Sequence, residues 1–165
     1  PDDARQALTD AGGKFAGWLP NYDVPGVFAR HRFTVHVPRR PYAEQLPGIP
    51  TIRPFEALAC GIPLVCAPWR DVEGLFSPGE DYLVARDGAH MTQLLAELRA
   101  DPMRARSLAF HGLRTIRARH TCAHRVDELV GILRSLGLRA AEDLGHADAA
   151  LSSTVPARVF GATPP

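Results

Sequence analysis

The chain has 165 residues, enough for one domain with a substantial apolar core. Its net charge of +1 and charged fraction of 22% are those of an ordinary globular protein, and they give no support for a nucleic-acid or anionic-membrane partner. No apolar run approaches the length of a membrane span, and the opening residues lack the pattern of a secretory signal. Because Cys60 and Cys66 lie in apolar runs and the cysteines are odd in number, we expect buried free thiols and a reducing, cytoplasmic compartment.

The first part of the chain predicts helices alternating with strands. It opens at Pro1 within a polar, helix-compatible stretch, so we expect a fragment of a longer protein. Pro20-Asn21 is a turn dipeptide, Asp23 suits a helix N-cap, and an apolar-polar alternation stops at Pro38. The predicted elements are a helix within residues 1–13, a strand over 15–19, a helix over 24–31 and a strand over 33–37.

The stretch GIPTIRPFEALACGIPLV predicts a loop, a short helix and a buried strand. Pro54 suits the first helical turn because its missing N–H needs no partner there. Gly61 is placed for a left-handed cap, and Pro63 prevents the helix from continuing. Glu56 then lies beside a helix start whose unpaired N–H groups can bind an anion. The helix is expected over residues 55–60 and the strand over 64–67.

The rest of the chain predicts one more strand and three helices. Pro78-Gly79 marks a turn, Asp101 with Pro102 marks a helix start, and Gly137 marks the end of the last helix. Strands alternating with helices, followed by helices alone, indicate an α/β fold with a parallel sheet flanked by helices. The strand is expected over 82–85, and the helices present apolar faces at Met91, Leu94, Leu95 and Leu98, at Leu108, Ala109, Leu113 and Ile116, and at Val126, Leu129, Val130 and Leu133.

The segment FEALACGIPLV resembles the E-A-x-A-x-G-x-P-[LIV]-[LIV] signature of the nucleotide-sugar-binding half of GT-B glycosyltransferases. Together with the later HTCAHR, it makes the chain look most like the CgeB-type spore-maturation-protein group. The resemblance implies that residues 1–137 form a Rossmann-like GT-B C-terminal domain, followed by a disordered tail over 138–165. It also implies a glycosyltransferase that uses a nucleotide-diphosphate sugar donor and an unknown acceptor.

The resemblance also implies roles for particular residues. In related glycosyltransferases an E-x7-E pair contacts the donor, and Glu56 matches the second glutamate, which holds the ribose hydroxyls. The first position falls on Gly48, so the carboxylate that contacts the sugar is absent. The acceptor site and any catalytic base are expected from an N-terminal GT-B half, so this fragment alone should be inactive. The absent glutamate favours an alternative, a non-catalytic module in surface or spore-coat assembly.

The remaining site candidates surround the predicted helix start. Thr51 and Ile52 can offer backbone N–H groups to phosphates, and Gly48 permits close backbone approach. Arginines bind phosphates bidentately, although a loop arginine is as often simply solvated. Glu56 has a structural alternative, because an N-cap at Arg53 would let it close a capping box. The arginine candidates are Arg39, Arg40 and Arg53.

No metal or cofactor is expected. His120 and His124 are spaced for one helix face, but no second cluster completes a zinc site, so this segment is better explained as a junction between two helices. An Asp-x-Asp motif for a divalent cation does not occur, and neither does the G-x-G-x-x-G pattern of dinucleotide-binding sites.

Overall fold

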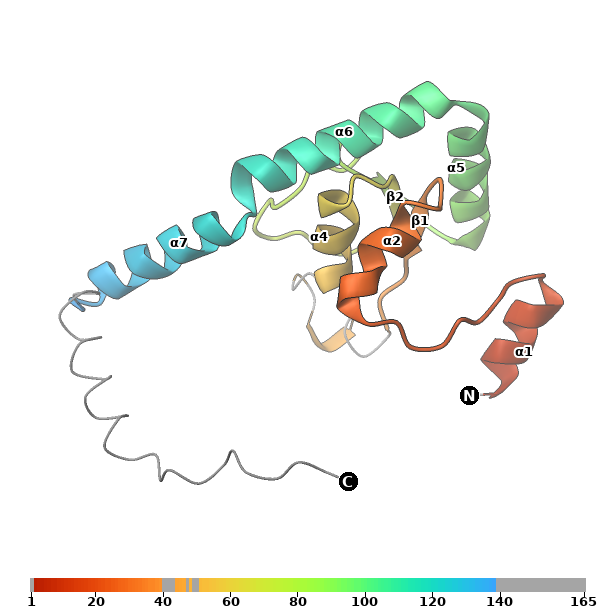
Figure 1. Cartoon of the computed structure of the whole chain (residues 1–165), viewed down its shortest axis with the longest axis horizontal. Coiled ribbons are helices and arrows are strands. Elements are labelled where there is room, and N and C mark those ends of the chain that lie inside the picture. Colours follow the sequence, from red (N-terminus) through yellow and green to blue (C-terminus); the bar gives the residue numbers. More distant parts are fainter. Residues whose placement is uncertain (1, 40–43, 47, 49–50, 139–165) are drawn as a thin grey trace, which may run out of the picture. The chain divides into compact units, whose positions relative to one another are not determined.

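The computed structural model describes residues 2–39, 44–46, 48 and 51–138 (Figure 1). It divides into two units, one ending at Arg119 and one beginning at His120, and each is described by itself. None of the described helices is long and apolar enough to cross a bilayer. In chain order the first unit contains α1 (Asp2–Asp10), η1 (Asn21–Asp23), α2 (Val24–Phe28), β1 (Thr34–His36), α4 (Ile52–Ala59), β2 (Leu64–Cys66), β3 (Leu83–Val84), α5 (Gly88–Ala100) and α6 (Pro102–Arg119).

The three strands form a parallel sheet in the order β1-β2-β3. Val65 of the central strand lies opposite Val35 on one side and Leu83 on the other. All three residues of β2 are buried, as expected for a parallel strand covered on both faces. The predicted α/β fold with a parallel sheet is therefore confirmed.

Side chains of β2 alternate between two apolar cores, one on each face of the sheet. Leu64 and Cys66 pack in the first core with Leu58 of α4. Val65 packs in the second core, to which α5 contributes Leu94 and Leu98. Helix α6 serves both cores, with Ile116 in the first and Leu108 in the second. This helix thereby fixes α4, which carries the predicted anion site, to the rest of the unit.

Local signals explain where α4 ends. Gly61 has φ +64°, a left-handed conformation that favours glycine. The Ile62 N–H donates to the Ala57 carbonyl at 3.2 Å, and the Gly61 N–H donates to the Leu58 carbonyl at 3.1 Å. These two bonds make a Schellman motif and satisfy carbonyls that the helix end would otherwise leave unpaired. The predicted glycine stop is confirmed.

The strand predicted over residues 15–19 does not form. Gly17 has φ +81°, and the Trp18 side chain is 86% exposed. No described strand pairs with this segment, and apolar β-formers adopt a strand only where a neighbouring strand is available. The prediction failed because it rested on the composition of this segment alone, and the segment has no neighbouring strand with which to pair.

The helix predicted over residues 24–31 is shorter, because α2 ends at Phe28. Beyond that point the chain continues in tight turns, with the Arg30 N–H donating to Val27 and the His31 N–H donating to Phe28. Asp23 occupies the N-cap position, but its side chain makes no capping hydrogen bond.

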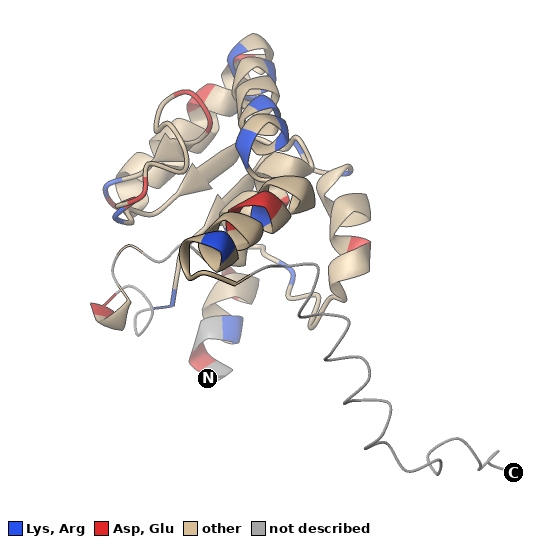
Figure 2. Ribbon diagram, turned by 90° about the vertical axis from the view of Figure 1, so that its left-hand side faces the viewer, with Lys and Arg blue, Asp and Glu red and all other residues tan. Residues whose placement is uncertain are grey.

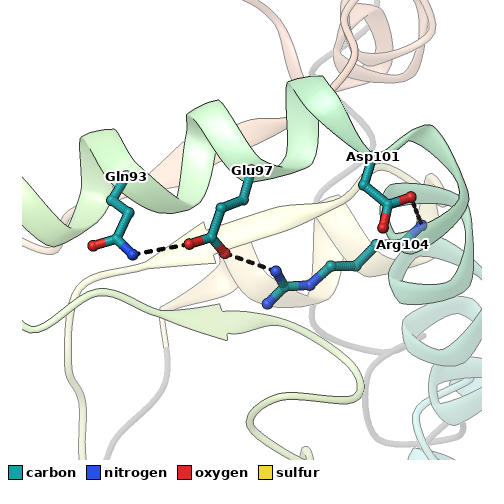
Figure 3. A network of polar contacts seen from close by, with 4 residues as sticks. All are labelled: Gln93, Glu97, Asp101 and Arg104. Atoms are coloured by element: carbon teal, nitrogen blue, oxygen red, sulfur yellow. Dashed lines mark hydrogen bonds and ion pairs between the residues drawn. The ribbon is translucent and has the colours of Figure 1, made fainter.

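A network of hydrogen bonds connects α5 and α6 where the chain turns from one helix to the other (Figure 3). The Asp101 carboxylate accepts from the backbone N–H groups of Met103 and Arg104 at 3.0 and 2.9 Å, which confirms the predicted helix start. Glu97 accepts from Gln93 at 2.9 Å and from Arg104 at 2.7 Å. Hydrogen bonds from Gln93 and then Arg104 lower the pKa of Glu97. The corner is thus held by backbone caps and by side chains.

Charged residues of α6 lie on its exposed side, where arginines recur along a helix that has no acidic residue (Figure 2). Arg117 and Arg119 occupy its last turn, where positive charge complements the helix dipole. Helix α6 is therefore basic, whereas the rest of the chain has more acidic than basic residues, and together they give the net charge of +1.

The second unit contains α7 (Cys122–Ser135). Thr121 and His124 form a capping box at its start, so the HTCAHR segment lies at the junction of two helices as predicted. Gly137, with φ +78°, ends the helix, and the Leu138 N–H donates to the Leu133 carbonyl. Residues 139–165, for which a disordered tail was predicted, lie outside the described residues.

The prediction that Cys60 is buried is wrong. Cys66 is buried in β2, but Cys60 caps the end of α4 and is exposed, as is Cys122; all three are free thiols. Burial, and next the charge of Glu56, raise the pKa of Cys60, whereas burial alone raises the pKa of Cys66 to about 12.

Thiol labelling should separate these cysteines. In native protein treated with a maleimide at pH 8, we expect Cys60 and Cys122 to label and Cys66 to label only after unfolding, because the thiolate is the nucleophile and must be accessible. Peptide mass spectrometry over time would measure each rate. Labelling of Cys66 as fast as Cys122 would contradict the buried position of β2.

Candidate functional site

The start of α4 lies beside the carboxyl end of β1, at the sheet edge where ligands of open α/β folds bind. Thr51 is the N-cap, but its side chain makes no hydrogen bond to the N–H groups of the helix. Its hydroxyl oxygen lies instead 2.9 Å from Nε2 of His36. The Thr51 side chain therefore does not cap the helix, and because Pro54 has no N–H, the N–H groups of Ile52 and Arg53 are those that the helix start can offer to an anion.

Arg53 and Glu56 lie one turn apart on α4. Nη1 of Arg53 is 2.9 Å from Oε2 of Glu56, and their side chains are 40% and 17% exposed. This ion pair lacks hydrogen-bond geometry, so the buried Oε2 accepts no hydrogen bond among the described groups. The Arg53 guanidinium also lies 6.0 Å from the centre of the Phe28 ring. A cation and a half-satisfied carboxylate thus stand together next to the uncapped helix start.

The capping-box explanation of Glu56 is wrong. It required an N-cap at Arg53, whereas the helix begins at Ile52 with Thr51 as N-cap. Glu56 consequently lies beyond the first turn, which contains no acidic residue, and its carboxylate pairs with Arg53. The expectation that Glu56 belongs to the first turn is corrected by the same observation.

Gly48 approaches protein backbone closely. It is buried with φ +95°, and a Cβ at this position would lie 3.1 Å from the Arg70 carbonyl oxygen and 3.1 Å from both methyl carbons of Val72. The loop that follows β2 thus occupies the space that a side chain at position 48 would need. A carboxylate cannot be placed there without moving that loop.

The other sequence candidates are only partly brought together. The Ile52 side chain is 64% exposed at the helix start, so its backbone N–H is its available donor group. Arg39 is exposed in the segment after β1, and no hydrogen bond places it at α4. Arg40 lies outside the described residues. The structure therefore unites Thr51, Arg53 and Glu56 most closely.

His36 is the site residue that sequence reasoning missed. It was assigned only to a strand, yet its half-buried ring contacts Thr51. Burial, and then the nearby Arg53 guanidinium, lower the pKa of His36 from its ordinary value of 6.5. The ring is therefore uncharged at neutral pH. The available signal was its position at the last residue of β1, on the edge where the loop to α4 begins.

The lowered pKa of His36 makes stability depend on pH. The unfolded chain binds a proton near pH 6.5 that the folded chain takes up only at lower pH, so folding should become less stable as pH falls through 6.5. In His36→Gln this contribution should be absent. Urea unfolding at pH 7.5 and pH 5.5 would measure the difference, and identical pH dependence in both proteins would contradict it.

Among the described residues, no group of three or more His, Cys, Asp or Glu side chains is placed to hold a metal ion. The site consists of backbone N–H groups, a hydroxyl, an imidazole and one Arg–Glu pair.

Comparisons with known proteins identify the family and the fold. The model of a family described as glycosyl transferase-like matches residues 4–131. Among solved structures, the chain is similar to a sucrose-phosphate synthase from Thermosynechococcus elongatus, with a TM-score of 0.65 and 17% sequence identity. The similarity covers 81% of this chain but only 33% of that enzyme, so the chain spans about a third of its length. No curated protein matches. The structural similarity shows the fold, a parallel sheet flanked by helices as in GT-B proteins.

Proposed function

The chain belongs to the glycosyl transferase-like family, and we propose that it supplies the donor-binding half of a glycosyltransferase. Its substrate is a nucleotide-diphosphate sugar, and the acceptor is bound by an N-terminal GT-B half of the same protein. On this proposal residues 1–137 form the C-terminal GT-B domain. The FEALACGIPLV and HTCAHR segments favour the CgeB-type group within the family, and three free thiols favour a cytoplasmic location.

One observation carries the proposal: the N-cap residue Thr51 does not bond the first N–H groups of α4, and these lie beside the Arg53–Glu56 pair. The diphosphate binds at this helix start, where N–H groups and the helix dipole favour negative charge. Arg53 keeps further N–H donors besides the one near Glu56, and these contact phosphate oxygens. Glu56, whose side chain is 17% exposed, accepts hydrogen bonds from the ribose hydroxyls.

The same groups assist departure of the diphosphate. Negative charge grows on the leaving phosphate as the glycosyl bond breaks. Donors already fixed around that position stabilise the charge without reorganising at the moment of reaction. The backbone of α4 is held in place by the Schellman motif at its C-terminal end and by packing against α6. The chain's contribution to catalysis is thus electrostatic, and proton transfer from the acceptor belongs to the other half.

A second function is a non-catalytic module of the same fold, in surface or spore-coat assembly. The observation that favours it is Gly48, where the family pattern has a carboxylate that contacts the sugar. The loop at Arg70 and Val72 fills that space, so the position cannot regain a carboxylate by substitution alone. Such a module would either bind nucleotide without transferring sugar or bind none.

Replacement of Glu56 by glutamine tests the proposal. We expect tenfold or greater loss of affinity for nucleoside diphosphate, because a hydrogen bond to a charged group contributes about 1.5–3 kcal/mol. Calorimetric titration with UDP, GDP and ADP measures it. Glu128→Gln is the matched control, since Glu128 also pairs with an arginine three residues away, Arg125, but on α7.

Two results would contradict the proposal in different ways. Equal affinity of the wild-type protein and Glu56→Gln would remove Glu56 from the ribose site. Absence of binding of all three nucleotides to the wild-type protein would favour the non-catalytic module. Unchanged affinity in Glu128→Gln is expected in either case.

A further inference from the structure

The Thr51 hydroxyl has an unusual partner for an N-cap residue. A threonine at this position commonly accepts a hydrogen bond from an N–H in the first turn of its helix. Here the third helical residue is Pro54, which has no N–H to donate, and the Thr51 side chain makes no cap bond; Oγ1 lies instead 2.9 Å from Nε2 of His36, a residue of a different element. The contact holds the hydroxyl on the β1 side of the helix start. Strand and helix are thereby joined at the edge where the anion site lies.

His36 has few charged neighbours in the described residues. Cys66 is its register partner on β2, and its thiol pKa of about 12 keeps it uncharged at neutral pH. On α4 the charged groups are Arg53 and Glu56, and the Arg53 charge acts against protonation of the ring. Without ligand, one ring nitrogen of the uncharged His36 carries a hydrogen. An anion at the α4 start would offset the effect of Arg53.

The direction of the His36–Thr51 hydrogen bond decides what the hydroxyl can do. If Thr51 donates to Nε2, its only proton is used within the protein. If Nε2–H donates to Oγ1, the hydroxyl proton remains available to a third group. A phosphate oxygen is an acceptor only, so a phosphate at the helix start selects the second arrangement. A hydroxyl that accepts from an imidazole is also a stronger donor, because linked hydrogen bonds polarise one another.

We propose that His36 is a positioning residue for the diphosphate: its Nε2–H orients the Thr51 hydroxyl so that this hydroxyl, with the uncapped N–H groups of α4, donates to a phosphate oxygen. The inference rests on the proposed donor-binding function and adds two side chains to that site. His36 acts through Thr51 and makes no contact with the reacting atoms. The hydrogen-bond chain runs from the ring to the hydroxyl and on to the phosphate.

The arrangement links binding to proton uptake. The imidazolium ion always carries hydrogen on Nε2, so the protonated ring fits the bound state and the diphosphate raises its proton affinity. Between the pKa values of the empty and the occupied site, binding takes up a proton, and affinity increases as pH falls. The phosphate loses charge near its own second pKa of about 6, which acts in the opposite direction in every variant. The comparison must therefore be made between proteins at each pH.

A double-mutant cycle tests whether His36 acts through Thr51. Affinity for UDP, GDP and ADP is measured by calorimetry for the wild-type chain, His36→Ala, Thr51→Val and the double variant. We expect each single change to weaken binding about tenfold and the double change to weaken it about tenfold as well, because residues that act as one unit are not additive. A hundredfold loss in the double variant would overturn the inference.

His36→Gln provides the readout that a structural role alone would not change. Its side-chain amide can donate to Thr51 but cannot titrate, so it should bind within a few-fold of wild type at pH 8. Between pH 8 and pH 6.5 the wild type should gain affinity relative to His36→Gln, with proton uptake detected in buffers of different ionisation enthalpy. Equal pH profiles would overturn the inference even if His36→Ala unfolds.

The two proposals fail separately. A wild-type chain that binds none of the three nucleotides refutes the donor-binding function and this inference with it. A wild-type chain that binds nucleotide, with additive variants or equal pH profiles, refutes only the role of His36.

Discussion

Replacing Gly112 by alanine is expected to destabilise the fold, although it adds only a single methyl group. A Cβ at this position would lie 2.6 Å from Cδ2 of Leu58 and 3.0 Å from the Asp81 carbonyl oxygen. Leu58 is 1% exposed, so any shift of its side chain must be absorbed by the surrounding core. The Asp81 backbone is equally fixed, because its buried carboxylate accepts from the Ser77 N–H and the Thr115 hydroxyl, each at 2.8 Å.

The stabilisation that alanine brings to a helix is smaller than the cost of overpacking the core. Overpacking a filled core costs about 1–3 kcal/mol, whereas alanine gains about 1 kcal/mol over glycine within a helix. We therefore expect a net loss of unfolding free energy, measured by urea denaturation followed by circular dichroism. Gly131→Ala on α7 is the control, since its Cβ would meet nothing within 4 Å. Equal stability of both variants would contradict the close α4–α6 packing.

The Gly112 contact also bears on the donor site. Helix α6 contacts α4 at Leu58, near the C-terminal end of α4, whereas Thr51 and Arg53 lie at its N-terminal end. A forced shift of α4 would displace the N–H groups proposed to bind phosphate. Loss of nucleotide affinity in Gly112→Ala is therefore expected alongside the loss of stability, although Gly112 lies outside the site.

Sequence reasoning succeeded where one element contains its own signals. Gly61 and the apolar run after it predict the end of α4 and a buried β2, because a left-handed cap and burial on both faces are local properties. Asp101 and Pro102 similarly predict the start of α6. Arg53 and Glu56 are neighbours as soon as a helix contains both, since residues three apart share a helix face.

It failed where a partner element decides the outcome. The strand predicted over 15–19 had suitable side chains but no neighbouring strand. The start of α4 was misplaced because Pro54 was taken to mark the first helical residue, whereas the helix begins at Ile52. The contact of His36 with Thr51 joins two elements, and no spacing rule relates them. Cys60 was predicted to be buried from its apolar neighbours, although a helix end turns outward there.

Sugar transfer by the 165-residue chain alone is expected to be absent even if the chain binds nucleotide. On the proposed function the acceptor is positioned by a second Rossmann-like half, and the described sheet is a single one of three strands. Two histidines that precede α4 in the chain already have partners within the protein. Nδ1 of His31 bonds the Val27 carbonyl at 2.7 Å beside α2, and His36 faces Thr51.

Without a second half to position the acceptor, the loss of rate should be large enough to measure clearly. Fixing an acceptor within attack distance and excluding water can account for about 7–11 kcal/mol of barrier lowering, many orders of magnitude in rate. A half-site retains diphosphate binding but loses this contribution. Turnover of UDP-, GDP- and ADP-glucose should therefore stay at the uncatalysed rate with the chain alone, and rise when the proposed N-terminal half is added in trans. Transfer by the chain alone would refute the two-half arrangement, because one sheet edge would then hold both substrates.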